Sequence, residues 1–214
     1  MKIEILCSSE QHPIFPYIEK WKEMNSNNHR IQLRTKLHDV EAGELLFSIS
    51  FLEKIPKSIR DKFMKTLVIH ASELPYGKGW SPHIWQILSG KNKFSVTLFE
   101  AVDEIDAGDI WHTEKIFLDG HELYDEINER LFEIELKLMD FAIKKFDTIK
   151  PIPQKTENYE YFQKRSPKDS ELNIKKTIEE QFNLMRVADA ERFPCFFYFR
   201  GKKYKLTLEK INED

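Results

Sequence analysis

The sequence predicts an α/β protein built on a doubly wound, Rossmann-like and mostly parallel sheet, with a short C-terminal helix and β-hairpin as an appendage. Along residues 1–150, apolar runs of strand length alternate with helical patterns, which is typical of a parallel sheet with helices on both faces. Pro151-Ile152-Pro153 then ends this first domain. The shorter region 151–214 closes with two apolar runs around a glycine, which predicts the hairpin.

The elements of the first domain follow from local patterns. Short, continuous apolar character is shared by the expected strands, which are residues 2–7, 45–51, 67–70 and 95–100. A proline at or near the start is shared by the expected helices, which are residues 14–21, 56–63 and 83–89. A strand, a helix and a second strand in succession predict a crossover connection between neighbouring parallel strands.

A long amphipathic helix is expected at residues 122–145, because apolar residues recur every three or four positions from Leu123 to Phe141. Core packing explains this stripe, so we assign it no chemistry. Beyond it we expect a polar, extended segment at 156–172, a helix around 178–185 and a hairpin formed by 195–199 and 204–208.

Composition excludes several classes of protein. The formal net charge is −3 and the pI is near 6.2, which argues against a protein that mainly binds nucleic acid. No apolar run approaches the roughly 20 residues of a membrane span, and the N-terminus lacks the pattern of a secretory signal, so we expect a cytoplasmic protein without membrane contact. Cys7 and Cys195 are far apart in apolar surroundings, which predicts buried thiols rather than a disulfide or a metal site.

Two motifs carry candidate chemistry. His70-Ala71-Ser72-Glu73-Leu74-Pro75 follows an expected strand, and Ile105-Asp106-Ala107-Gly108-Asp109 lies in a later loop. A neutral histidine accepts a proton near pH 7, and an aspartate beside it orients the ring and stabilises its cation. Such a pair can deprotonate an attacking amine. A histidine that is merely hydrogen-bonded at a strand end, and an aspartate that merely makes a turn, would produce the same residues one at a time.

Taken together, the two motifs resemble the signature segments of the folate-dependent formyltransferases, the family of methionyl-tRNA formyltransferase and the nucleotide-sugar N-formyltransferases. The resemblance implies transfer of a formyl group from 10-formyltetrahydrofolate to an amine. It places His70 on the general base and Asp106 on its partner acid, with Asp109 as the local competitor.

One position departs from the family pattern. An asparagine that holds the formyl oxygen usually stands two residues before the histidine, where this chain has Val68. Loss of one oxyanion donor typically costs about 2.7–4 kcal/mol of transition-state stabilisation. Thr66, Ser50, backbone amides and His70 itself are the alternatives that could replace the missing amide.

The resemblance also places the folate cofactor against two loops, 50–56 and 102–107. The expected cofactor contacts are Phe51, Leu52, Val102, Ile105 and Ala107. For Phe51 and Leu52, ordinary packing explains the apolar character equally well.

The amine acceptor is expected to be a small molecule. Only some sixty residues follow residue 153, too few for the basic tRNA-binding domain of methionyl-tRNA formyltransferases. The segment from His70 to Pro82 is most similar to formyltransferases linked to pseudaminic-acid biosynthesis, which act on a UDP-linked 4-amino-4,6-dideoxy sugar. The expected substrate-binding residues are Ser72, Lys78, Arg165 and Arg186, with Arg192 as a further cation and Tyr161 and Phe162 as stacking or packing aromatics.

Two other functions stay open at this point. A domain that lost the asparagine could bind an amino sugar without turning it over, and a formyltransferase could act on an aminoacyl group attached to a carrier domain. The hairpin phenylalanines Phe196, Phe197 and Phe199 are candidates for a subunit contact in a homodimer.

Overall fold

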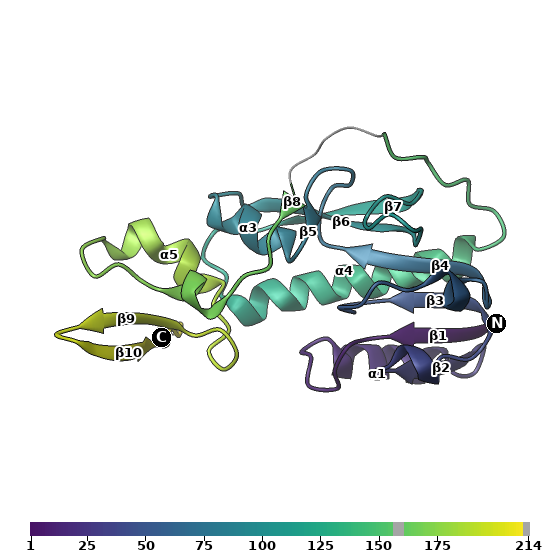
Figure 1. Ribbon diagram of the computed structural model, residues 1–214, viewed down its shortest axis with the longest axis horizontal. Helices are drawn as coiled ribbons and strands as arrows, with labels where there is room; N and C mark the ends of the chain where they lie inside the picture. Colours follow the sequence, from purple (N-terminus) through teal and green to yellow (C-terminus); the bar gives the residue numbers. More distant parts are fainter. Residues whose placement is uncertain (156–160, 212–214) are drawn as a thin grey trace.

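A six-stranded sheet forms the centre of the molecule, and the computed structural model describes residues 1–155 and 161–211 (Figure 1). The strand order is β2-β1-β3-β4-β6-β7. Their bounds are β1 Lys2–Leu6, β2 Arg30–Arg34, β3 Gly43–Ser48, β4 Phe63–His70, β6 Lys93–Glu100 and β7 Ile110–Phe117. The pairs β1/β2, β1/β3 and β3/β4 are parallel, which confirms the mostly parallel Rossmann-like sheet.

The expected strand at 95–100 exists as β6 but runs antiparallel to β4, and β2 and β7 are strands that were not expected from the sequence. Between β4 and β6 the chain contains only loops, the two-residue strand β5 (Lys78–Gly79) and the seven-residue helix α3 (Pro82–Leu88). A helix of that size is about 10 Å long, whereas β4 with its eight residues spans about 26 Å. The chain therefore enters β6 at the end where β4 finishes.

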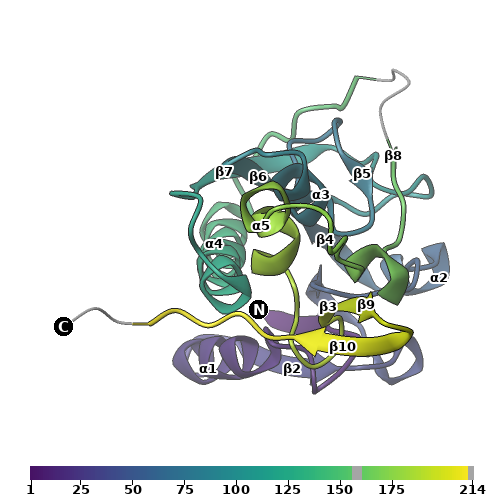
Figure 2. The same ribbon diagram turned by 90° about the vertical axis from the view of Figure 1, so that its left-hand side faces the viewer.

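Helices cover both faces of the sheet. α1 (Phe15–Asn25) and α4 (Tyr124–Lys145) lie together on one face, and the short α2 (Lys57–Arg60) lies on the other (Figure 2). The buried stripe of α4, which the sequence predicted, packs on the same apolar cluster as Ile3, Phe47 and Val96 from the strands. Acidic residues in its first turn and lysines in its last turn suit the helix dipole.

The C-terminal region contains β8 (Tyr161–Phe162), helix α5 (Ile178–Arg186) and the hairpin β9 (Cys195–Phe199) and β10 (Lys202–Leu206). Arg200 and Gly201 join the hairpin strands with φ values of 48° and 73°, as a two-residue type I′ turn requires. Residues 156–160 of the expected extended segment lie outside the described residues. The subdivision at residue 150 stays a prediction.

The C-terminal region lies beyond the carboxyl ends of β1, β3 and β4, at the left of Figure 1. In open α/β sheets ligands bind outside these ends. The fold therefore places the second region over the edge of the sheet where a site is expected. In the described part of the chain, no helix has the length and apolar character required to cross a membrane.

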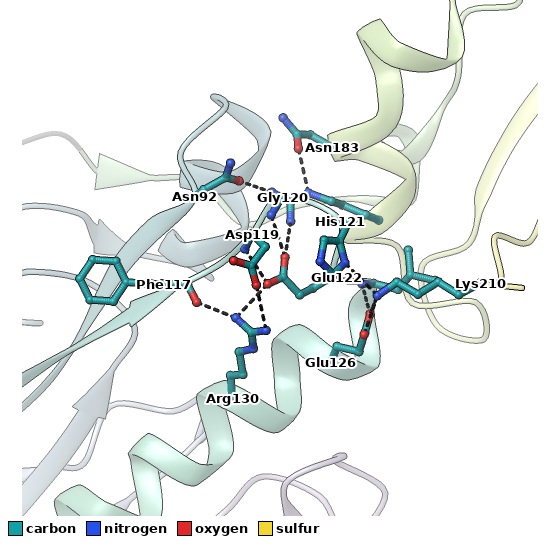
Figure 3. Close-up of polar contacts among 12 residues, drawn as sticks. Asn92, Phe117, Asp119, Gly120, His121, Glu122, Glu126, Arg130, Asn183 and Lys210 are labelled. Carbon is teal, nitrogen blue, oxygen red and sulfur yellow. Dashed lines mark hydrogen bonds and ion pairs between the residues drawn. The ribbon is translucent and has the colours of Figure 1, made fainter. Parts of the chain in front are cut away.

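A buried polar cluster joins the two regions (Figure 3). Glu122 accepts hydrogen bonds from the backbone N–H groups of Asp119 (2.7 Å) and Gly120 (2.9 Å) and pairs with Arg130 at 2.8 Å. Burial alone would raise the pKa of Glu122, but these donors lower it to about 2. Arg186 at the end of α5 lies against this carboxylate, with 3.7 Å between Nη1 and Oε2.

Candidate active site

His70 is the last residue of β4 and points its ring at the following loop. Its Nε2 lies 3.0 Å from the carbonyl oxygen of Gly77. A carbonyl oxygen only accepts hydrogen bonds, so this contact requires the proton on Nε2 and leaves the lone pair on Nδ1. The ring is therefore held in the state in which Nδ1 can take up a proton.

Asp106 lies on the loop between β6 and β7, and the structure brings it next to His70. Its Oδ2 is 3.8 Å from His70 Nε2, which is ion-pair distance, and accepts a hydrogen bond of 3.0 Å from the backbone N–H of Gly79. Both side chains are largely buried. A carboxylate in this position stabilises a positive charge on the imidazole ring.

The loop that carries Asp106 closes on itself at Gly108. A Cβ atom added to Gly108 would lie 1.7 Å from the carbonyl oxygen of Glu100, so the two backbone segments touch. The backbone N–H of Glu100 donates to the carbonyl of Asp109 at 2.9 Å. Asp106 itself has φ of 54°, a left-handed conformation that aspartate tolerates better than most residues. This closure turns Asp106, rather than Asp109, towards His70.

The residues expected to contact the cofactor are mostly exposed apolar side chains. Leu52, Val102 and Ile105 are 59%, 41% and 55% exposed, although their side chains are apolar. Ala107 is half-buried beside Asp106. Phe51 is half-buried against the apolar cluster around Leu46 on the α2 face, so part of its role is packing.

At the position of the missing asparagine, Val68 is half-buried and supplies no donor. The hydroxyl of Thr66, on the same strand, is buried without a hydrogen-bond partner among the described residues, and so is the hydroxyl of Ser72. Ser50 adopts φ of 48° at the end of β3. Thr66 and Ser50 both stay candidates for the lost donor.

The expected substrate-binding residues lie in different places. Lys78 borders the Asp106 loop, with its Nζ 3.3 Å from Glu104 Oε1. Ser72 is fully buried, and its carbonyl oxygen accepts a bond of 2.7 Å from Thr97. Arg165 is half-buried and donates to the carbonyl of Asp169 at 3.1 Å.

Arg186 requires a correction, because it is 0% exposed. Its guanidinium donates to Asn92 Oδ1 and Asn183 Oδ1, both at 2.8 Å. The side chain therefore joins α5 to the core and is not available to a diphosphate. Arg192 is likewise engaged, since it bonds Asp189 and the hydroxyl of Tyr124.

Two features of the site were missed by the sequence analysis. His83 lies in the first turn of α3, and its Nδ1 is buried without a partner in the described residues. Burial, together with the nearby His70, lowers its pKa to about 3, so the ring is neutral. The second feature is the pairing of β5 with β8, which brings Phe162 to the loop after His70. The one sequence signal for His83 was a second histidine directly after Pro82.

The cysteines and the hairpin phenylalanines lie outside this pair of catalytic candidates. Cys7 and Cys195 are free, buried thiols, as predicted. Phe196 is only 7% exposed, so it cannot form the expected subunit contact from the hairpin surface. A cavity of about 370 Å³ lies between the start of α4 and the hairpin, lined by Tyr124 and Arg192 among others, and it includes neither His70 nor Asp106.

Comparison with known proteins identifies relatives of this chain. The family model described as "Formyl transferase" matches residues 5–143. A methionyl-tRNA formyltransferase from Natranaerobius thermophilus is 28% identical over 193 residues, covering 87% of this chain and 59% of that protein. The chain thus spans about three fifths of the length of this curated relative.

Solved structures share the fold at low sequence identity. A methionyl-tRNA formyltransferase from Clostridium thermocellum superposes with a TM-score of 0.84 and 22% identity, covering 99% of this chain and 94% of that one. A sugar N-formyltransferase from a Shewanella species superposes with a TM-score of 0.75 and 18% identity, covering 100% and 99%.

Proposed function

This chain belongs to the formyl transferase family, and on that premise we propose that it transfers the formyl group of 10-formyltetrahydrofolate to the amine of a nucleotide-linked 4-amino-4,6-dideoxy sugar, most simply a UDP-linked one. The observation that carries the proposal is the His70 and Asp106 pair at the carboxyl edge of the sheet, 3.8 Å apart. A pair of this kind can take a proton from an amine, which binding alone does not require.

In the proposed reaction His70 is the general base. Its Nε2–H is held by the carbonyl of Gly77, so Nδ1 accepts the proton of the attacking amine. The resulting imidazolium places its Nε2–H between that carbonyl and the carboxylate of Asp106. Both oxygens stabilise the positive charge, which is the role of a buried aspartate beside a catalytic histidine.

The cofactor would lie against the loops at 50–52 and 102–107. Exposed Leu52, Val102 and Ile105 fit this use, because an apolar ring system would cover side chains that otherwise face water. When bound, 10-formyltetrahydrofolate would supply the formyl carbon that the amine attacks; the bond from this carbon to the folate nitrogen would break, and His70 would return the proton to that nitrogen. The backbone of the Asp106 loop and the side chain of Ala107 complete the proposed wall.

A nucleotide sugar is the favoured acceptor for two reasons. The net charge of −3 suits a small acceptor better than a polyanionic tRNA. The second is compatibility of the fold, because the sugar N-formyltransferase structure matches this chain over almost the whole length of both, as the methionyl-tRNA formyltransferase structure also does. Lys78 beside the Asp106 loop, Arg165 and the exposed Tyr161 are the groups we propose for the phosphates and the base.

Methionyl-tRNA is the second candidate acceptor, favoured by the 28% identical relative and by the TM-score of 0.84. The experiment that decides is formyl transfer from 10-formyltetrahydrofolate to a panel of UDP- and dTDP-linked amino sugars and to methionyl-tRNA, read by mass. We expect one sugar to gain a formyl group.

The variant His70→Gln should lower kcat/KM by about 10²–10⁴-fold, the usual contribution of a general base. His38→Gln is the matched control, since this histidine is 75% exposed on the surface. If methionyl-tRNA is the only substrate that gains a formyl group, it takes the place of the nucleotide sugar as the acceptor. Tight sugar binding without product would show instead a domain that binds and does not catalyse.

A further inference from the structure

Both candidate catalytic side chains are held by the backbone of one short loop, residues 77–80. The carbonyl of Gly77 accepts from His70 at 3.0 Å, and the N–H of Gly79 donates to Asp106 at 3.0 Å. The distance between the imidazole and the carboxylate therefore depends on where this loop lies. Neither β4 nor the Asp106 loop sets it alone.

The loop is in turn held by a segment from the other end of the chain. We call residues 161–164 the strap. Strand β5 in the loop pairs in parallel with β8 in the strap, with Lys78 opposite Tyr161 and Gly79 opposite Phe162. The N–H of Trp80 donates to the carbonyl of Phe162 at 2.9 Å. A Cβ at Gly79 would lie 2.3 Å from that carbonyl oxygen, so the two backbones are in close contact.

Side chains strengthen the same connection. The rings of Phe162 and Trp85 are stacked, with centroids 6.4 Å apart and planes 6° apart. Trp85 Nε1 donates to the carbonyl of Gln163 at 3.0 Å. Lys164 places its ammonium 4.8 Å from the centre of the Trp80 ring. Side chains thus join the strap to Trp80 of the loop and to Trp85 of α3, the helix that follows the loop.

Phe162 also reaches the residue that holds the base. A Cβ at Gly77 would lie 3.3 Å from the Cε2 atom of Phe162, so the phenyl ring packs directly on Gly77. The carbonyl of this same glycine accepts from His70 Nε2. Displacement of the ring would free Gly77 and the imidazole with it.

We infer that Phe162 is a positioning residue, through which the C-terminal strap sets the tautomer and orientation of His70 and its distance from Asp106. The inference rests on the proposed function for the role of His70 as a base. The positioning itself is a property of the free protein, so it can be measured without substrate. Loosening the loop by about 1 Å would cost up to about 100-fold in turnover.

The first test is ¹⁵N NMR of the His70 imidazole, assigned by comparison with His70→Gln. We expect the parent to hold the Nε2–H tautomer and Phe162→Ala to show a mixture of both tautomers. Phe162→Tyr, which keeps the ring, should restore the parent spectrum. Phe117→Ala, which removes an exposed phenylalanine from β7, is the matched control and should leave the spectrum unchanged.

The second test is kinetic and uses the acceptor found above. Phe162→Ala should lower kcat about 10- to 100-fold and shift the pH profile of kcat/KM, while the KM for the acceptor stays near that of the parent. If Phe162→Ala does not fold, Trp85→Phe removes the bond to Gln163 while keeping an aromatic ring beside Phe162, and should produce a smaller change of the same kind.

The outcomes separate the two proposals. A folded Phe162→Ala protein with the parent's imidazole spectrum would overturn the inference, whatever the activity. A parent protein that formylates no acceptor would remove the proposed function, and the NMR comparison would still decide whether the strap positions His70.

Discussion

Glu135 is a carboxyl group in the apolar core, on the buried face of α4. Burial raises its pKa from 4.5 to about 8. Between these two values the folded protein holds a proton that the unfolded chain releases, so the free energy of unfolding falls as the pH rises. The slope is at most about 1.4 kcal/mol per pH unit.

We therefore expect Glu135→Gln to raise the Tm relative to the parent at pH 8, with little difference at pH 4.5, because the amide has no proton to lose. Thermal unfolding at a series of pH values measures this. Glu133→Gln, on the exposed side of the same helix, is the control and should follow the parent. An equally steep fall of stability in Glu135→Gln would contradict the assignment.

Gly108 offers a second prediction for a single residue. A methyl group there would overlap the carbonyl oxygen of Glu100, so a backbone segment must move, and Asp106 lies only two residues from Gly108 on the same loop. We expect Gly108→Ala to lose about 1–3 kcal/mol of stability, as overpacking does, and to lose most of its formyl transfer. Denaturant unfolding and a transfer assay test the two parts, and parent-like values in both would show that the loop adapts freely.

Helix α5 is attached to the core through the side chain of Arg186. The guanidinium is buried; it bonds the exposed Asn92 before β6 and Asn183 on its own helix, and it lies against the buried Glu122. Removing one partner of a buried ionic contact typically costs about 3–5 kcal/mol. The hydrogen bond from Arg186 to Asn92 links residues 94 positions apart in the chain.

We expect Arg186→Met to destabilise the protein by about 3 kcal/mol or more, measured by denaturant unfolding. Lys137→Met is the control, since its pair with Glu114 is exposed and should contribute less than about 1 kcal/mol. A loss as small as that of the control would mean that apolar packing, rather than this cluster, holds α5.

At the scale of the whole molecule, the hairpin presents aromatic side chains to the surface. Tyr198, Phe199 and Tyr204 are exposed, whereas Phe196 is buried. Exposed apolar patches of this kind often mark interfaces, so the homodimer stays a prediction, with Phe199 kept from the expected residues, Phe196 withdrawn and the two tyrosines added. We expect light scattering to give a dimer mass for the parent and a monomer mass for Phe199→Ser with Tyr204→Ser. An unchanged mass would exclude this surface.

Prediction from the sequence succeeded where the signal is local. The apolar stripe of α4 and the glycine turn of the hairpin are set by neighbouring residues, and both were located to within a few positions. It failed for β2 and for the direction of β6, because strand pairing depends on how far the intervening chain can reach.

For the site, the sequence by itself determined which residues can do acid and base chemistry, since His70 and Asp106 each stand in a recognisable segment of the chain. Only the tertiary structure decided that they lie 3.8 Å apart, that Phe162 supports the loop between them and that Arg186 is buried. The physical reason is that a side chain's chemistry is local, while its burial and its partners come from segments distant in sequence.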